Sequence, residues 1–179
     1  MHLLVRRALQ TYLAEKRILS QADVESDMLK FTTQKDALFI TLYLDQKVIA
    51  SAGRIQCQKE NSFLECIDLA LLTLKDPRFS QNLQNVDELA KISIRVDVLG
   101  QNARRLLKSI DELDIKSEGI IFLSQSLGVM SIILPKMIQN DPSPQRYFEL
   151  TCKKAGVDSE KLQSSDYVIY GLSTEVSSE

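Results

Sequence analysis

The side chains best suited to chemistry in this 179-residue chain are few, and they do not form a standard catalytic set. The only histidine is His2, close to the first residue, where we expect fraying. A Ser-His or Cys-His dyad needs a rigidly held imidazole, as does a multi-histidine metal centre, so these mechanisms are disfavoured. The six glycines are scattered and match neither phosphate-binding fingerprint. We therefore expect neither a metal nor a cofactor.

The three cysteines, Cys57, Cys66 and Cys152, show an odd count and no repeated spacing, which argues against a disulfide framework and a zinc finger. Cys66 and Cys152 fall in apolar helical patterns and are predicted to be small core residues. Cys57 follows a strand, and the neighbouring Arg54 and Lys59 could lower the pKa of its thiol, so a reactive role stays open. Without a signal-peptide pattern, this cysteine usage predicts a cytoplasmic protein.

One polar cluster, Asp76-Pro77-Arg78-Phe79, has two interpretations. In the first, Pro77 stops a helix, Asp76 caps or pairs with Arg78, and Phe79 pins the turn into the core. In the second, Arg78 points into a cleft, where its planar guanidinium could hold a carboxylate or a phosphate. Physical reasoning alone favours the structural interpretation.

The helices and strands that must position these residues are predicted from the spacing of apolar residues and from the capping and turn residues between them. Apolar spacing predicts a first helix over residues 3–16. It predicts a second helix along the apolar stripe from Phe63 to Leu74, with a capping box formed by Ser62 and Glu65. A third helix is predicted to begin at Pro144, with Ser143 as its cap, and to end just before Gly156. Residues 18–35 read as an irregular connection. Strands are predicted over 37–44, 48–55, 92–98, 119–124, 129–134 and 166–172. Strand pairs joined by turns, with helices between them, favour an α+β fold with an antiparallel sheet.

Charge and side-chain size constrain the partners. The net charge is −2, and the basic pairs Arg6-Arg7, Arg104-Arg105 and Lys153-Lys154 are short and expected on solvated helix faces. This pattern favours neither nucleic acid nor a membrane as partner. Small residues at 50–53 crowd the second strand, which indicates that another group packs close to its backbone.

Five motifs in register give the chain a family resemblance. They are Asp76-Pro77-Arg78-Phe79, Asp87-Glu88-Leu89, Glu118-Gly119-Ile120, Ile133-Leu134-Pro135 and Cys152-Lys153-Lys154-Ala155-Gly156. In this order, from about Leu3 to Gly171, the chain resembles an AMMECR-type domain. The resemblance implies a compact α+β unit with an antiparallel sheet, flanking helices and a smaller α/β subdomain. It also implies Memo-like and radical SAM proteins as partners, because members are often found beside or fused to them.

The chain departs from that family at its hallmark. Where the family reads Leu-Arg-Gly-Cys-Ile-Gly, residues 48–53 read Val-Ile-Ala-Ser-Ala-Gly, so only the last glycine is kept. Ile49 replaces the arginine and Ser51 replaces the cysteine. A serine without a base is a poor nucleophile, so the resemblance implies a divergent member that has lost any chemistry of that cysteine.

Together these observations predict one AMMECR-like domain over residues 1–172 and a disordered tail over 173–179. The leading hypothesis is a non-catalytic accessory or protein-interaction protein. The alternative is an enzyme acting on a small metabolite or a modified side chain in a cleft near Ser51 and Arg78, with Ser51 as its catalytic candidate. The residues expected to form the contact surface are Ala50, Ser51, Gly53, Arg54, Asp76 and Arg78.

Overall fold

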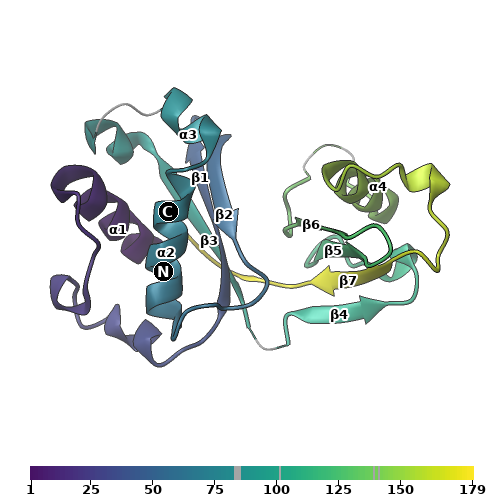
Figure 1. Ribbon diagram of the computed structural model, residues 1–179, viewed down its shortest axis with the longest axis horizontal. Coiled ribbons are helices and arrows are strands. Elements are labelled where there is room, and N and C mark those ends of the chain that lie inside the picture. Colours follow the sequence, from purple (N-terminus) through teal and green to yellow (C-terminus); the bar gives the residue numbers. More distant parts are fainter. Residues whose placement is uncertain (83–85, 101, 139, 141) are drawn as a thin grey trace. The chain divides into compact units, whose positions relative to one another are not determined.

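The computed structural model describes residues 1–82, 86–100, 102–138, 140 and 142–179, and the chain forms two compact units. Unit 1 consists of residues 1–100 and 175–179, and unit 2 of residues 101–174. Each unit combines one four-stranded antiparallel sheet with helices (Figure 1). The α+β fold class is therefore confirmed. The single domain that we expected over residues 1–172 is divided between these two units.

The sheet of unit 1 has the strand order β2-β1-β3-β8, and every neighbouring pair is antiparallel. Its central strands carry strong β-formers, and the β1–β2 turn has positive φ at both Asp45 and Gln46, as a two-residue hairpin of this kind requires. Thr41 of β1 lies opposite Ser51 on one side and Arg95 on the other. The strands are β1 (Ala37–Leu44), β2 (Lys47–Gly53), β3 (Ser93–Leu99) and β8 (Glu175–Ser178).

The last strand, β8, differs from the disordered tail that we expected over residues 173–179. It pairs with β3 in antiparallel register, with Ser178 opposite Arg95. The backbone N–H of His2 donates to Ser177 Oγ at 3.2 Å, which fastens the strand to the first helix. Only one of its four residues is apolar, so its order comes from tertiary pairing and not from a local pattern.

Two long helices cover one face of this sheet (Figure 1). The core between helices and sheet includes Leu9, Ile40, Phe63 and Leu69, all fully buried. The helices are α1 (His2–Glu15), α2 (Ser62–Thr73) and α3 (Pro77–Asn82), with 3-10 turns η1 (Gln21–Asp23), η2 (Leu29–Thr32) and η3 (Val86–Lys91). The turns η1 and η2 occupy the connection that we predicted to be irregular.

The start of α2 corrects the predicted capping box. The N-cap is Asn61, whose Oδ1 accepts the N–H of Leu64 at 3.0 Å. Ser62 Oγ instead accepts the N–H of Asp36 at 2.7 Å. The Glu65 carboxylate accepts the N–H of Lys59 in the loop before the helix. The N-cap lies one residue before the predicted Ser62, because asparagine caps a helix as well as serine does. At the other end, α2 stops at Thr73, and Pro77 begins α3.

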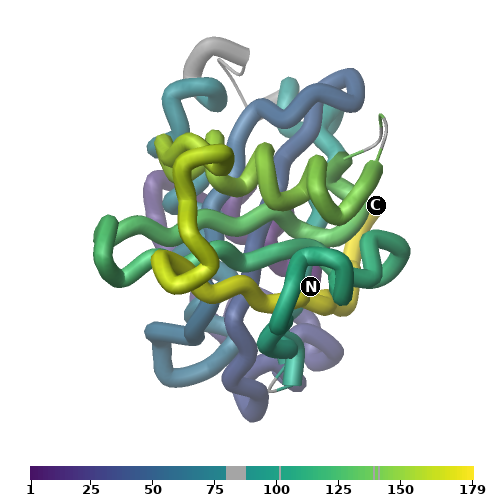
Figure 2. Tube along the Cα trace, turned by 90° about the vertical axis from the view of Figure 1, so that its right-hand side faces the viewer, coloured from purple at the N-terminus to yellow at the C-terminus, as the bar shows by residue number. Residues whose placement is uncertain are grey.

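The sheet of unit 2 has the order β4-β7-β5-β6, and α4 packs on one of its faces (Figures 1 and 2). The buried core of this unit includes Ile120, Phe122, Tyr147 and Phe148. As predicted, Ser143 caps α4 and Pro144 is its first residue. The elements are β4 (Arg104–Leu107), η4 (Ile110–Glu112), β5 (Gly119–Ser124), β6 (Val129–Ile133), α4 (Pro144–Lys154), η5 (Ser159–Lys161) and β7 (Val168–Leu172).

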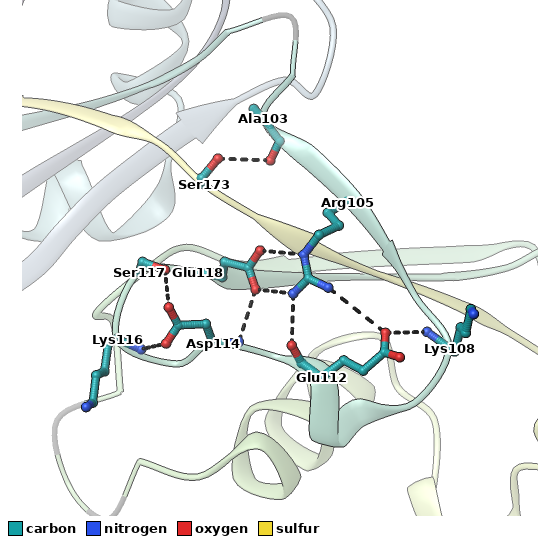
Figure 3. Close-up of polar contacts among 9 residues, drawn as sticks. All are labelled: Ala103, Arg105, Lys108, Glu112, Asp114, Lys116, Ser117, Glu118 and Ser173. Atoms are coloured by element: carbon teal, nitrogen blue, oxygen red, sulfur yellow. Dashed lines mark hydrogen bonds and ion pairs between the residues drawn. The ribbon is translucent and has the colours of Figure 1, made fainter.

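The pair Arg104-Arg105 lies on strand β4, which corrects its predicted place on a helix face. Arg105 donates to Glu118 through Nε and Nη2, at 3.2 and 2.9 Å, and to the carbonyl of Glu112 at 2.8 Å (Figure 3). The N–H of Asp114 donates to the same Glu118 carboxylate. A Cβ at Gly171 would lie 2.7 Å from that carboxylate, so a side chain there would displace the Glu118 carboxylate from its place beside Arg105. This cluster is structural: it fixes β4 to the loop before β5.

Among the described residues, no helix has both the length and the apolar composition needed to cross a bilayer.

Candidate functional site

The residues predicted from the polar cluster and from the small-residue strand meet at the edge of the unit 1 sheet. Asp76 is the N-cap of α3: its Oδ1 accepts the N–H of Arg78 at 3.0 Å. Its Oδ2 accepts the N–H of Ser51 from β2 at 3.1 Å. Phe79 is 6% exposed and anchors the turn in the core, as predicted. One carboxylate therefore joins the start of α3 to the edge strand.

The guanidinium of Arg78 completes this arrangement. Its Nε and Nη2 donate to the two oxygens of Asp76 at 3.0 and 2.6 Å, and Nη2 also reaches Ser51 Oγ at 3.2 Å. The Arg78 side chain is 49% exposed, whereas that of Asp76 is 11% exposed. Hydrogen bonds from the Arg78 side chain, and from the N–H groups of Arg78 and Ser51, hold the pKa of Asp76 well below its usual range. We call Ser51, Asp76 and Arg78 the Ser51 surface.

The one carboxylate in this arrangement, Asp76, is a weak general base for Ser51, because its ion pair with Arg78 lowers its pKa. The Ser51 hydroxyl lies beside a guanidinium, which donates hydrogen bonds and cannot take a proton at ordinary pH. The chain's one histidine, His2, is instead engaged by Ser177, whose Oγ lies 2.9 Å from its Nδ1. Three hollows among the described residues are lined by other residues. The geometry suits recognition of an anionic or hydrogen-bonding group better than nucleophilic attack.

Three other expected contact residues lie elsewhere. Ala50 is fully buried beneath the helices, so it cannot touch a partner. A Cβ at Gly53 would lie 2.0 Å from the ring of Phe39, so the group that packs close to this strand is Phe39. Arg54 belongs to a separate cluster and donates through Nη1 to Glu65 at 3.0 Å and pairs through Nη2 with Asp68 at 2.8 Å.

Sequence reasoning missed the role of Glu65. This carboxylate is fully buried, and its Oε2 accepts the N–H groups of Gln58 at 3.0 Å and Lys59 at 2.9 Å. It therefore organises the loop between β2 and α2. The available signal was its position: Glu65 lies three residues after Ser62 and four before Leu69, within the buried stripe of the helix.

The cysteines behave as core or shielded residues. Burial, followed by the charge of Glu65, raises the pKa of the Cys57 thiol, which corrects the expectation that Arg54 and Lys59 would lower it. The two basic groups are occupied by Glu65 and Asp68. Burial raises the pKa of Cys66 to about 12 and that of Cys152 to about 11. All three cysteines are free, and none carries the properties of an activated nucleophile.

Across the part of the chain that the structure describes, no group of three or more His, Cys, Asp or Glu side chains could hold a metal ion.

Comparisons with known proteins show the family and the fold. The AMMECR1 family model matches residues 2–176 of the chain. The chain belongs to the AMMECR1 family. Among solved structures, this AMMECR1-family protein is similar to the uncharacterised protein PH0010 from Pyrococcus horikoshii, with a TM-score of 0.82 and 19% identity over 99% of this chain and 89% of that one. At this identity the likeness shows the fold alone. A comparison with curated proteins finds no match.

In this AMMECR1-family chain, replacing Asp76 by asparagine is expected to cost about 1 kcal/mol of unfolding free energy near neutral pH. Asparagine keeps the helix cap and loses the ion pair with Arg78. The folded state lowers the pKa of Asp76, so the pair stabilises above the unfolded carboxyl pKa of about 4, and this contribution fades as pH falls. Urea unfolding should show a gap between the proteins at pH 7 that narrows toward about pH 3. A gap independent of pH would contradict the ion-pair account.

Proposed function

We propose that this AMMECR1-family protein is a non-catalytic accessory protein, and that it binds a protein partner through the Ser51 surface. The observation that carries the proposal is the contact between Ser51 Oγ and Arg78 Nη2 at 3.2 Å, on an arginine that is half exposed. The hydroxyl contacts a cation, and the neighbouring Asp76 carboxylate is a weak base because its pKa is lowered, which supports binding over catalysis.

The chemistry of the Ser51 surface favours an acidic group on the partner. Asp76 holds the Arg78 guanidinium in one orientation, so little side-chain entropy remains to be lost when a ligand binds. A planar guanidinium beside a hydroxyl suits a carboxylate. We propose a Memo-like or a radical SAM protein as the partner, and a cytoplasmic location in keeping with the three free cysteines.

The test is direct binding between purified proteins. The chain is immobilised, and the Memo-like and radical SAM proteins of the same organism are passed over it at low and moderate salt. Arg78→Ala is expected to weaken binding about tenfold or more, the effect of removing a hydrogen-bonded charge at an interface. The matched control is Arg17→Ala, because Arg17 is similarly exposed and also paired with carboxylates, at Glu15 and Asp23.

Two outcomes decide the matter. Binding of either protein that is lost with Arg78→Ala and kept with Arg17→Ala supports the proposal. If neither protein binds the wild-type chain at micromolar concentration, or both variants bind as the wild type does, the Ser51 surface is not the contact and the proposal fails.

The second candidate is an enzyme acting on a small metabolite or a modified side chain. It is favoured by one feature: Ser51 is exposed and its hydroxyl is already hydrogen-bonded to a group that could bind a substrate anion. A thermal-shift screen of carboxylated and phosphorylated metabolites tests it. A hit whose stabilisation disappears in Ser51→Ala and Arg78→Ala supports the small-molecule site that this candidate requires, whereas stabilisation that persists in both variants excludes this site.

A further inference from the structure

Two hollows lie side by side at one end of unit 2, where the β5–β6 turn meets the segment that leads into β7. The first has a volume of about 570 Å³ and is walled by Leu127, Val129, Val157 and Leu162. The second, of about 470 Å³, is walled by Leu123, Tyr167, Val168 and Tyr170. Ser126 and Asp166 line both hollows, so the two meet at these residues.

The apolar walls of these hollows are open to solvent. Leu127 at the tip of the turn is 51% exposed, and Val168 is 41% exposed. Gly128, which follows Leu127 in the turn, has a φ of +64°, a backbone conformation that favours glycine. Exposed apolar residues gathered around a hollow, rather than scattered singly, indicate a contact site.

Asp166 is the charge between the two hollows. Its Oδ2 accepts the N–H of Gln163 at 2.8 Å, and its backbone carbonyl accepts the hydroxyl of Ser124 at 2.7 Å, so the residue is held in place. Within the described residues, no lysine or arginine forms an ion pair with its carboxylate. The other acid at this site, Asp158, is already paired with Lys161 at 3.1 Å.

Charges of both signs lie around the first hollow. Ala155 and Gly156 line it just after the end of α4, and Lys153 and Lys154 in the last turn of that helix offset the partial negative charge of the helix end. The pair of Asp158 and Lys161 is neutral overall. Among the charged side chains that line the two hollows, this pairing leaves the carboxylate of Asp166 to be matched by a cation of the ligand, between apolar walls on either side.

We propose that these two hollows and Asp166 form a groove for an extended peptide segment of a partner protein, with a basic residue flanked on the same face by two apolar residues. In an extended chain, side chains at i, i+2 and i+4 point the same way and span about 13 Å. The sequence pattern is therefore apolar-x-basic-x-apolar. The groove lies wholly in unit 2, and the inference does not depend on the Ser51 surface.

The test is a titration of the full ¹⁵N-labelled chain, followed by amide NMR, with the peptide acetyl-Leu-Ser-Arg-Ser-Leu-amide. A second peptide carries glutamate in place of arginine. We expect amide shifts at Leu127, Gly128, Gly156 and Val168, and a dissociation constant about tenfold lower for the arginine peptide, which corresponds to about 1.4 kcal/mol.

Two variants locate the preference. Asp166→Asn keeps the oxygen that accepts the Gln163 N–H and removes the charge, so it should reduce the tenfold preference to within about twofold. Asp158→Asn is the matched control, because Asp158 is already neutralised by Lys161, and it should leave the preference in place.

The inference is overturned if the arginine and glutamate peptides bind the wild-type chain alike, a comparison that needs no variant. It is overturned equally if neither peptide shifts these amides at millimolar concentration, if the shifts map to other residues, or if Asp166→Asn and Asp158→Asn have the same effect.

Discussion

Replacing Gly119 with alanine is expected to lower the free energy of unfolding by about 3 kcal/mol or more, the upper range for forcing extra atoms into a packed site. A Cβ at this position would lie 2.1 Å from the carbonyl oxygen of Ile133 and 2.6 Å from the carbonyl carbon of Leu134. These are backbone atoms of β6 and the residue after it, so they cannot rotate aside as a side chain would. The start of β5 would have to move away from its neighbour.

The matched control is Gly100→Ala, because a Cβ there would meet no atom within 4 Å and the change of residue type is identical. Its effect should stay within about 0.5 kcal/mol. Urea unfolding followed by circular dichroism measures both proteins. Where the two units unfold in separate transitions, the loss belongs in that of unit 2, which contains Gly119. Equal stability of the two variants would mean that β5 and the end of β6 are not this close.

Local sequence signals predicted the elements that carry strong patterns. The bounds of β1 and β5 agree with the predicted ranges 37–44 and 119–124, since both are runs of β-formers ended by turn residues. The cap and proline that begin α4 were likewise readable. By contrast, β4 and β8 have four residues each and little pattern, and they exist because β7 and β3 offer a partner edge.

The candidate site was predictable only where its residues are neighbours in sequence. The pairing of Asp76 with Arg78 and the burial of Phe79 follow from adjacent residue types. The link to Ser51, 25 residues away, depends on the packing of α3 against the edge of β2, which no local pattern encodes. Arg54 was expected at the same surface, but a buried carboxylate on α2 holds it elsewhere.

That carboxylate, Glu65, leads to the second large effect: Glu65→Ala is expected to cost about 3 kcal/mol, the lower range for removing one partner of a buried ion pair. The change leaves the N–H groups of Gln58 and Lys59 without their acceptor and takes one of two carboxylates from Arg54. Asp68→Ala is the control, because Asp68 shares Arg54 but is 35% exposed, and it should cost less than about 1 kcal/mol.

The same substitution should also expose the chemistry of Cys57. Burial is the largest cause that raises the pKa of its thiol, and the charge of Glu65 is the next. Removing Glu65 should therefore lower that pKa in two ways, because the loop becomes looser and the negative charge is lost. More thiolate forms at a given pH, and modification by a thiol-specific disulfide reagent should become about tenfold faster. Cys66 and Cys152 stay buried in the folded protein and should not react. Unchanged reactivity of Cys57 in Glu65→Ala, beside a clear loss of stability, would mean that Glu65 holds the loop but does not shield the thiol.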